Sequence, residues 1–129
     1  MIDRRTLERC RALRKEVDRI RDRIREIAPK TTVRLDYVSR GTTRGQPTEE
    51  AAIARIDLET LLTDTLRSYT SIVDDIATAC VNLEPSLREV VLMRYVDGND
   101  WNEVADRLRY SEARVYELHR IALKELSKQ

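Results

Sequence analysis

The 129-residue sequence has no phenylalanine, one tryptophan, and only three residues each of glycine and proline. Positions that break a helix are therefore few, and the residues that favour strands and tight turns are scarce. Charged residues make up 36% of the chain, which leaves little room for broad apolar faces. These absences favour an all-α fold over a sheet-based one.

Cysteines and long apolar runs are also scarce. Cys10 and Cys80 are far apart, and each falls on an apolar helical position, so we interpret both as buried core residues and predict no disulfide framework, metal or cofactor. No apolar run approaches the ~18 residues of a membrane span, and residues 1–30 are too charged for a signal-peptide core. We expect a cytoplasmic protein without a membrane partner.

The net charge of +1 hides an uneven distribution. Residues 1–30 carry 11 basic against 6 acidic side chains, whereas residues 48–83 carry 2 against 7. Opposite charge on two helices favours their pairing, although exposed ion pairs contribute only about 0–1 kcal/mol each. The basic side chains of the first helix, including Arg4, Arg5, Arg9, Arg11 and Arg14, could equally make a second contact with DNA.

Apolar periodicity predicts a helical arm over residues 1–83. A helix over 3–28 stops at Pro29, a loop covers 29–47, and a long helix over 48–83 begins with Thr48 as N-cap. Each helix has a narrow heptad seam. The first seam comprises Cys10, Leu13, Val17, Ile20, Ile24 and Ile27, and the second comprises Leu62, Leu66, Tyr69, Val73, Ile76, Cys80 and Leu83. The seams predict a two-helix coiled-coil-like hairpin within one chain or pairing between two chains as a homodimer, and both alternatives stay open.

Residues 84–129 predict a separate three-helix unit. Pro85 suits the first turn of a helix, and Gly98 is the expected stop. Asp100 and Glu103 form a capping-box-like pair at the next helix start. Ala105 is small enough to allow a tight crossing between the second and third helices, the arrangement of a helix-turn-helix unit.

The third helix predicts a DNA-reading face. With Val115, Leu118 and Ala122 turned inward, the outward side chains can meet base edges, while nearby basic residues and the helix N-terminus at Ser111 can meet phosphates. Residues 107–128 carry 6 basic against 3 acidic side chains. The candidate DNA-binding residues are Arg107, Arg109, Ser111, Glu112, Ala113, Arg114, Tyr116, Glu117, Arg120 and Lys124.

Three stretches carry a family resemblance. Residues 83–98, 101–108 and 115–126 resemble the fourth conserved region of bacterial sigma factors. The Arg-rich first helix, Arg40-Gly41-Thr42, residues 48–53 and residues 115–123 make the whole chain similar to small phage and prophage regulators of the RinA and ArpU type. The resemblance implies promoter binding and regulation of transcription.

Two positions differ from that family pattern. Arg109 stands where the family commonly has glycine in the turn, and a positive φ there would cost arginine about 1 kcal/mol. Glu112 stands where sigma factors often place a basic residue, so we expect a different base preference.

The sequence therefore predicts a DNA-binding transcription regulator that contacts duplex DNA and RNA polymerase. The alternative is a helical interaction protein that docks on polymerase or another transcription component without reading DNA. His119 is the only histidine, and we interpret it as a half-buried helix residue rather than a ligand or catalyst. No combination of nucleophile, base and orienting residue is visible, so we predict that the chain is not an enzyme.

Overall fold

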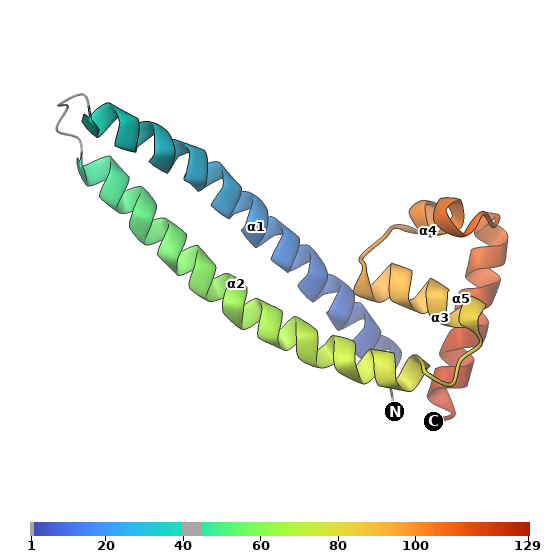
Figure 1. The fold of residues 1–129 in the computed structure, drawn as a ribbon. Coiled ribbons are helices and arrows are strands. Elements are labelled where there is room, and N and C mark those ends of the chain that lie inside the picture. The colour runs from blue at the N-terminus through green and yellow to red at the C-terminus, as the bar shows by residue number, and fades with distance from the viewer. Residues whose placement is uncertain (1, 40–44) are drawn as a thin grey trace. The chain divides into compact units, whose positions relative to one another are not determined.

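The computed structural model describes the backbone of residues 2–39 and 45–129, and the side chains of residues 2–27 and 49–129. Within these residues the chain is all-α, as predicted, and no strand is present. Figure 1 shows the elements in chain order. They are α1 (Arg4–Ser39), α2 (Gly45–Cys80), α3 (Pro85–Val91), the π-helical turn η1 (Leu92–Val96), α4 (Trp101–Leu108) and α5 (Glu112–Ser127).

The two long helices differ from their predicted bounds. α1 does not stop at Pro29 but continues to Ser39, because one proline removes only one backbone hydrogen bond and a helix can absorb it with a bend. α2 begins at Gly45, so Pro47 lies in its first turn, where a missing N–H needs no partner. Thr48 is consequently inside α2 and is not its N-cap. Within the predicted loop over residues 29–47, residues 29–39 belong to α1 and residues 45–47 belong to α2. Residues 40–44 lie outside the described residues.

The chain divides into two compact units, one formed by Met1–Lys15 with Ser68–Gln129 and the other by Glu16–Arg67. α1 and α2 each contribute to both units. This division differs from the predicted boundary between residues 83 and 84, because the beginning of α1 and the end of α2 belong with the C-terminal helices.

The first unit has one continuous apolar core. α3 and α4 both pack against α5, and the ends of α1 and α2 close the core. Leu7 and Cys10 come from α1 and are fully buried, which no periodicity within residues 84–129 could indicate. The other buried residues of this core are Ile2, Ile76, Cys80, Leu83, Leu87, Val90, Val91, Tyr95, Val104, Ala105, Val115, Leu118, Ala122 and Leu126.

Local signals at the start and end of the short helices are confirmed. Pro85 occupies the first turn of α3. Gly98 has a φ of +78°, and a Cβ at this position would lie 3.1 Å from Cγ of Arg14. Glycine is therefore suited to this site both by its backbone conformation and by the close approach of α1. Between α3 and Gly98 the chain widens into η1, where the amide of Asp97 donates to the carbonyl of Leu92 at 2.9 Å.

In the second unit the predicted seam residues that follow are buried or half-buried. Val17 and Ile20 of α1 are buried, and Ile24 is half-buried. On α2, Leu62 and Leu66 are half-buried, and Thr65 is buried with its hydroxyl donating to the carbonyl of Leu61. No helix that the structure describes is both long enough and apolar enough to span a bilayer.

Candidate nucleic-acid interface

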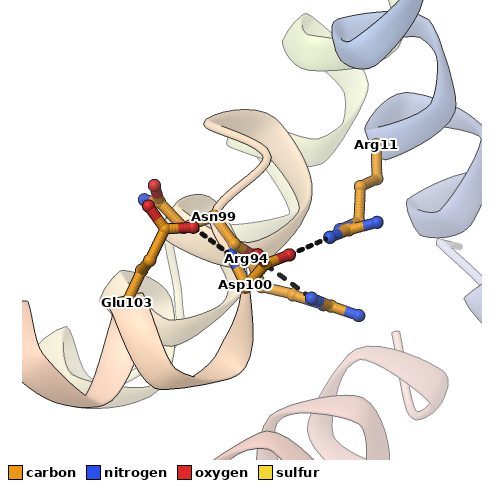
Figure 2. A network of polar contacts seen from close by, with 5 residues as sticks. All are labelled: Arg11, Arg94, Asn99, Asp100 and Glu103. Carbon is orange, nitrogen blue, oxygen red and sulfur yellow. Dashed lines mark hydrogen bonds and ion pairs between the residues drawn. The ribbon is translucent and has the colours of Figure 1, made fainter.

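α4 is held at its first residue by two carboxylates (Figure 2). The backbone N–H of Asp100 donates to Oε1 of Glu103 at 2.8 Å, which is the expected interaction of a capping-box glutamate. Oδ1 of Asp100 accepts a hydrogen bond from Nη2 of Arg11 at 3.0 Å. The side chain of Arg11 is only 17% exposed, whereas that of Asp100 is 63% exposed, so water reaches one partner of this charge pair. The start of α1 thus fixes the start of α4.

A second arginine supports the same end of α4 from η1. Nη1 of Arg94 donates to the carbonyl of Asn99 at 3.2 Å, and its guanidinium lies 4.4 Å from the centre of the Trp101 ring. Burial, followed by repulsion from Arg11, lowers the pKa of Arg94 from its usual value. Arginine over an aromatic face is a favourable cation–π arrangement. It fixes the orientation of Trp101 against α5.

Trp101 connects α4 to α5 through an aromatic cluster. Its ring centre lies 5.2 Å from that of Tyr116 and 4.6 Å from that of His119. His119 is 8% exposed, so the half-buried position that we predicted for it is in fact a buried one. The hydroxyl of Tyr95 lies 2.5 Å from Nε2 of His119. The cluster therefore holds the two helices together beneath the exposed ring of Tyr116.

The turn between α4 and α5 centres on Arg109, which has a φ of 60° and a ψ of 41°. It is the one residue other than glycine with a positive φ among the described residues. The positive φ that costs arginine about 1 kcal/mol is thus present at this position. The amide of Tyr110 donates to the carbonyl of Ala105 at 3.0 Å, which closes the end of α4.

The N-terminus of α5 is capped as predicted. Ser111 lies in an extended conformation, and its Oγ accepts a hydrogen bond from the amide of Arg114 at 3.1 Å. Glu112 in the first turn suits the positive end of the helix dipole. The cap fixes where α5 starts and, with it, the rotation of every side chain along α5.

All ten predicted DNA-binding residues are exposed, and they lie together at the end of α4, in the turn and along α5. Tyr116 is 48% exposed despite its contact with Trp101. Ala113, Tyr116, Glu117, Arg120 and Lys124 recur at steps of three or four residues on α5, so they share one side of the helix. Val115, Leu118 and Ala122 are buried, as predicted. The ten residues form what we call the α5 face.

The α5 face has more basic than acidic residues. Five of its ten residues are arginine or lysine, and two are glutamate. Arg114 and Glu117 form an ion pair, with Nη1 and Oε2 3.4 Å apart. A convex helix with an excess of exposed cations and a polar N-terminus can approach a polyanion.

The sequence prediction missed the residues that support this face. The sequence does not distinguish Arg11 from the other basic residues of the first helix, which could form ion pairs or contact DNA. The structure pairs it with Asp100, which is 89 positions away. Arg94 lies in a stretch that carries the family resemblance, but neither its sequence position nor that of Asn99 predicts a contact with the start of α4. Within the part of the chain that the structure describes, no group of three or more His, Cys, Asp or Glu side chains could hold a metal ion.

No protein-family model, curated protein or solved structure matches this chain.

The strained turn gives a first prediction. Replacing Arg109 with glycine should raise the free energy of unfolding by about 0.5–1 kcal/mol, because the left-handed conformation costs a side-chain-bearing residue about 1–2 kcal/mol and the freer unfolded chain offsets part of the gain. Arg109→Ala serves as the control, since it removes the same charge and keeps the strain. Urea denaturation that finds the glycine variant no more stable than the alanine variant would contradict this account of the turn.

The buried histidine gives a second prediction, concerning pH. Burial, followed by repulsion from Arg4 and Arg94, lowers the pKa of His119 from 6.5 to about 4. The folded state thus favours the neutral ring, whose Nε2 can accept the Tyr95 hydroxyl; burial also raises the pKa of Tyr95. The stability that His119 contributes is present above about pH 6.5 and is lost as the pH falls toward 4, by up to about 3 kcal/mol.

The control for this pH dependence is His119→Gln, which keeps a hydrogen-bonding side chain but cannot titrate. Its free energy of unfolding should fall less between pH 7 and pH 4 than that of the original chain, although the variant starts from a lower stability. Urea denaturation at several pH values measures both curves. Parallel curves would mean that His119 does not control acid stability.

Proposed function

We propose that this chain is a sequence-specific DNA-binding transcription regulator in which α4 and α5 form a sigma-like helix-turn-helix and α5 enters the major groove. The observation that carries the proposal is the joint exposure of all ten residues of the α5 face around a capped N-terminus. Arg114 and Arg120 suit guanine edges, and Tyr116 or Ala113 suits a thymine methyl group. Arg107, Arg109 and Lys124 suit phosphates, which position the unit without reading sequence.

The aromatic and ionic contacts behind the α5 face support this proposal. Base readout needs side chains held in one orientation, and α4 is fixed at both ends, by Arg11 and Arg94 near its start and by the turn at Arg109. The contact between Trp101 and Tyr116 then sets the ring of Tyr116 relative to both helices. A phage or prophage origin and a contact with RNA polymerase belong to the proposal through the sequence resemblance alone.

The arm has a separate part in the proposal. We propose that α1 and α2 form the coiled-coil-like hairpin and that the arm sets how many DNA-binding units meet one promoter. Ile53 and Ile56 on α2 are 60% and 61% exposed, a pair of apolar side chains suited to a second chain. Light scattering on the purified protein distinguishes a dimer, which implies paired DNA half-sites, from a monomer, which does not.

Fluorescence anisotropy with a labelled duplex of random sequence tests the proposal, with titrations at about 50 mM and 200 mM salt. A DNA-binding α5 face predicts measurable affinity at the lower salt that falls steeply at the higher salt, because binding releases counterions from the phosphates. No affinity at the lower salt would contradict the proposal.

The second candidate is a helical interaction protein that docks on a transcription component. A shallow groove of about 430 Å³ favours it, and this groove borders the α5 face because Arg114 contributes to its lining. Leu83, Leu87, Leu118 and Ile121 supply its apolar part, and Ile121 is 37% exposed. Residues 84–129 also have a near-neutral balance of 8 basic against 9 acidic side chains. Absent DNA binding together with capture of a protein partner would favour this candidate.

A further inference from the structure

Glu117 is an unusual residue at the position where it lies. It occupies the middle of the α5 face, with Ala113 one turn before it and Arg120 and Lys124 after it. A carboxylate at this position repels a polyanion, so it lowers affinity for DNA in general. Its ion pair with Arg114 adds little to the free energy of unfolding, because the side chains of Glu117 and Arg114 are 49% and 51% exposed and exposed pairs contribute little.

The side chains of this pair can reach neighbouring base pairs. Residues three apart on a helix are separated by about 4.5 Å along its axis, which lies between one and two base-pair rises of about 3.4 Å. Arg114 offers only donors, which suit guanine, and Glu117 offers only acceptors, which suit the amino group of cytosine. Guanine and thymine would instead present acceptor oxygens to the carboxylate of Glu117.

From this arrangement we infer that Glu117 is a specificity-determining residue that acts mainly by exclusion. In the free protein it holds the guanidinium of Arg114. On duplexes with guanine or thymine at the facing position, it lies against base acceptors and phosphates and weakens binding. On the matching site, the cytosine amino group satisfies Glu117, and Arg114 meets the neighbouring guanine. The inference rests on the proposed function, because it concerns how the same face chooses its DNA.

The chain offers a closely matched control. Glu125 also lies on α5, is 48% exposed and pairs with a basic residue three positions away, Lys128, at 3.7 Å. It lines the groove with Leu118 and Ile121, next to Arg114, but is not itself one of the predicted DNA-binding residues. Glu117→Gln and Glu125→Gln therefore remove the same charge from the same helix, within the α5 face and at its border.

The experiment measures two properties of the original chain and both variants. Anisotropy with a labelled random duplex should show that Glu117→Gln binds about three- to tenfold more tightly than the original chain, while Glu125→Gln changes by less than about twofold. Selection from a random duplex library, followed by sequencing, should show a cytosine preference at one position in the original chain. In Glu117→Gln that preference should move toward adenine, which glutamine can recognise.

Several results would overturn the inference. Equal tightening in both variants would show a general charge effect, and unchanged or weaker binding of Glu117→Gln would show that the carboxylate does not exclude DNA. An identical base preference in all three proteins would show that Glu117 reads no base. The absence of any duplex binding by the original chain would refute the proposed function itself, and the inference with it.

Discussion

Replacing Leu7 with alanine is expected to lower the free energy of unfolding of the first unit by about 2–5 kcal/mol. Leu7 comes from the second turn of α1 and is fully buried in the core that α3, α4 and α5 share. Removing most of a buried leucine side chain loses its apolar burial and leaves a cavity, and these effects are additive. Because most domains are stable by only about 5–15 kcal/mol, this single change should shift the unfolding transition strongly.

The control is Val81→Ala, which shortens an apolar side chain of the same unit that is 65% exposed. It should change the free energy of unfolding by less than about 1 kcal/mol. Urea denaturation followed by the fluorescence of Trp101 reports on the first unit directly, since this tryptophan lies between α4 and α5. Equal effects of the two truncations would contradict the inclusion of α1 in the core beneath the α5 face.

Replacing Arg114 or Arg120 with alanine is expected to weaken duplex binding by about 1–3 kcal/mol, which corresponds to about 5- to 150-fold in affinity. Both side chains are exposed on α5, so the substitutions should leave the free energy of unfolding nearly unchanged. The effect should be greatest on a selected site and smaller on random duplex, because a base contact contributes to sequence discrimination and a phosphate contact does not.

Lys128→Ala is the control for net charge, since Lys128 follows the end of α5 and its side chain is 62% exposed. Lys128→Ala should weaken duplex binding less than either arginine variant, because it removes one positive charge outside the α5 face. Anisotropy titrations at one salt concentration compare the three variants. Full affinity in both arginine variants would reject the α5 face as the docking surface.

Much of the candidate site could be predicted because its signals are local. A proline at the first turn of α3, a glycine in the left-handed conformation after η1 and the Asp100–Glu103 pair each act within four residues. The inward positions on α5 follow from the helical period alone. For Arg109 the sequence indicated only the cost that a positive φ would carry, because arginine itself gives no signal for the left-handed conformation.

The remaining features could not be predicted because they depend on residues far apart in the chain. Leu7 and Cys10 join the core of helices that begin more than 70 positions later. The Tyr69 hydroxyl donates to the carbonyl of Val96 at 2.6 Å and accepts from Arg14 at 3.4 Å, so three segments meet at one atom. Periodicity showed that α1 and α2 have apolar seams but could not indicate that their ends belong to the C-terminal unit. The predicted helix end at Pro29 was wrong. The free-energy cost of proline inside a helix is an average, and α1 continues through Pro29.

The central claim is that the α5 face is the surface that contacts DNA, and mapping of backbone amide shifts tests it most directly. Labelled protein is titrated with a random duplex at low salt, and the amide signals are followed residue by residue. The account predicts the largest changes in the turn at Arg109 and along α5 from Ser111 to Lys124, with little change around Leu83 and Leu87. Changes confined to Leu83, Leu87 and the residues between them, or no changes at all, would contradict it.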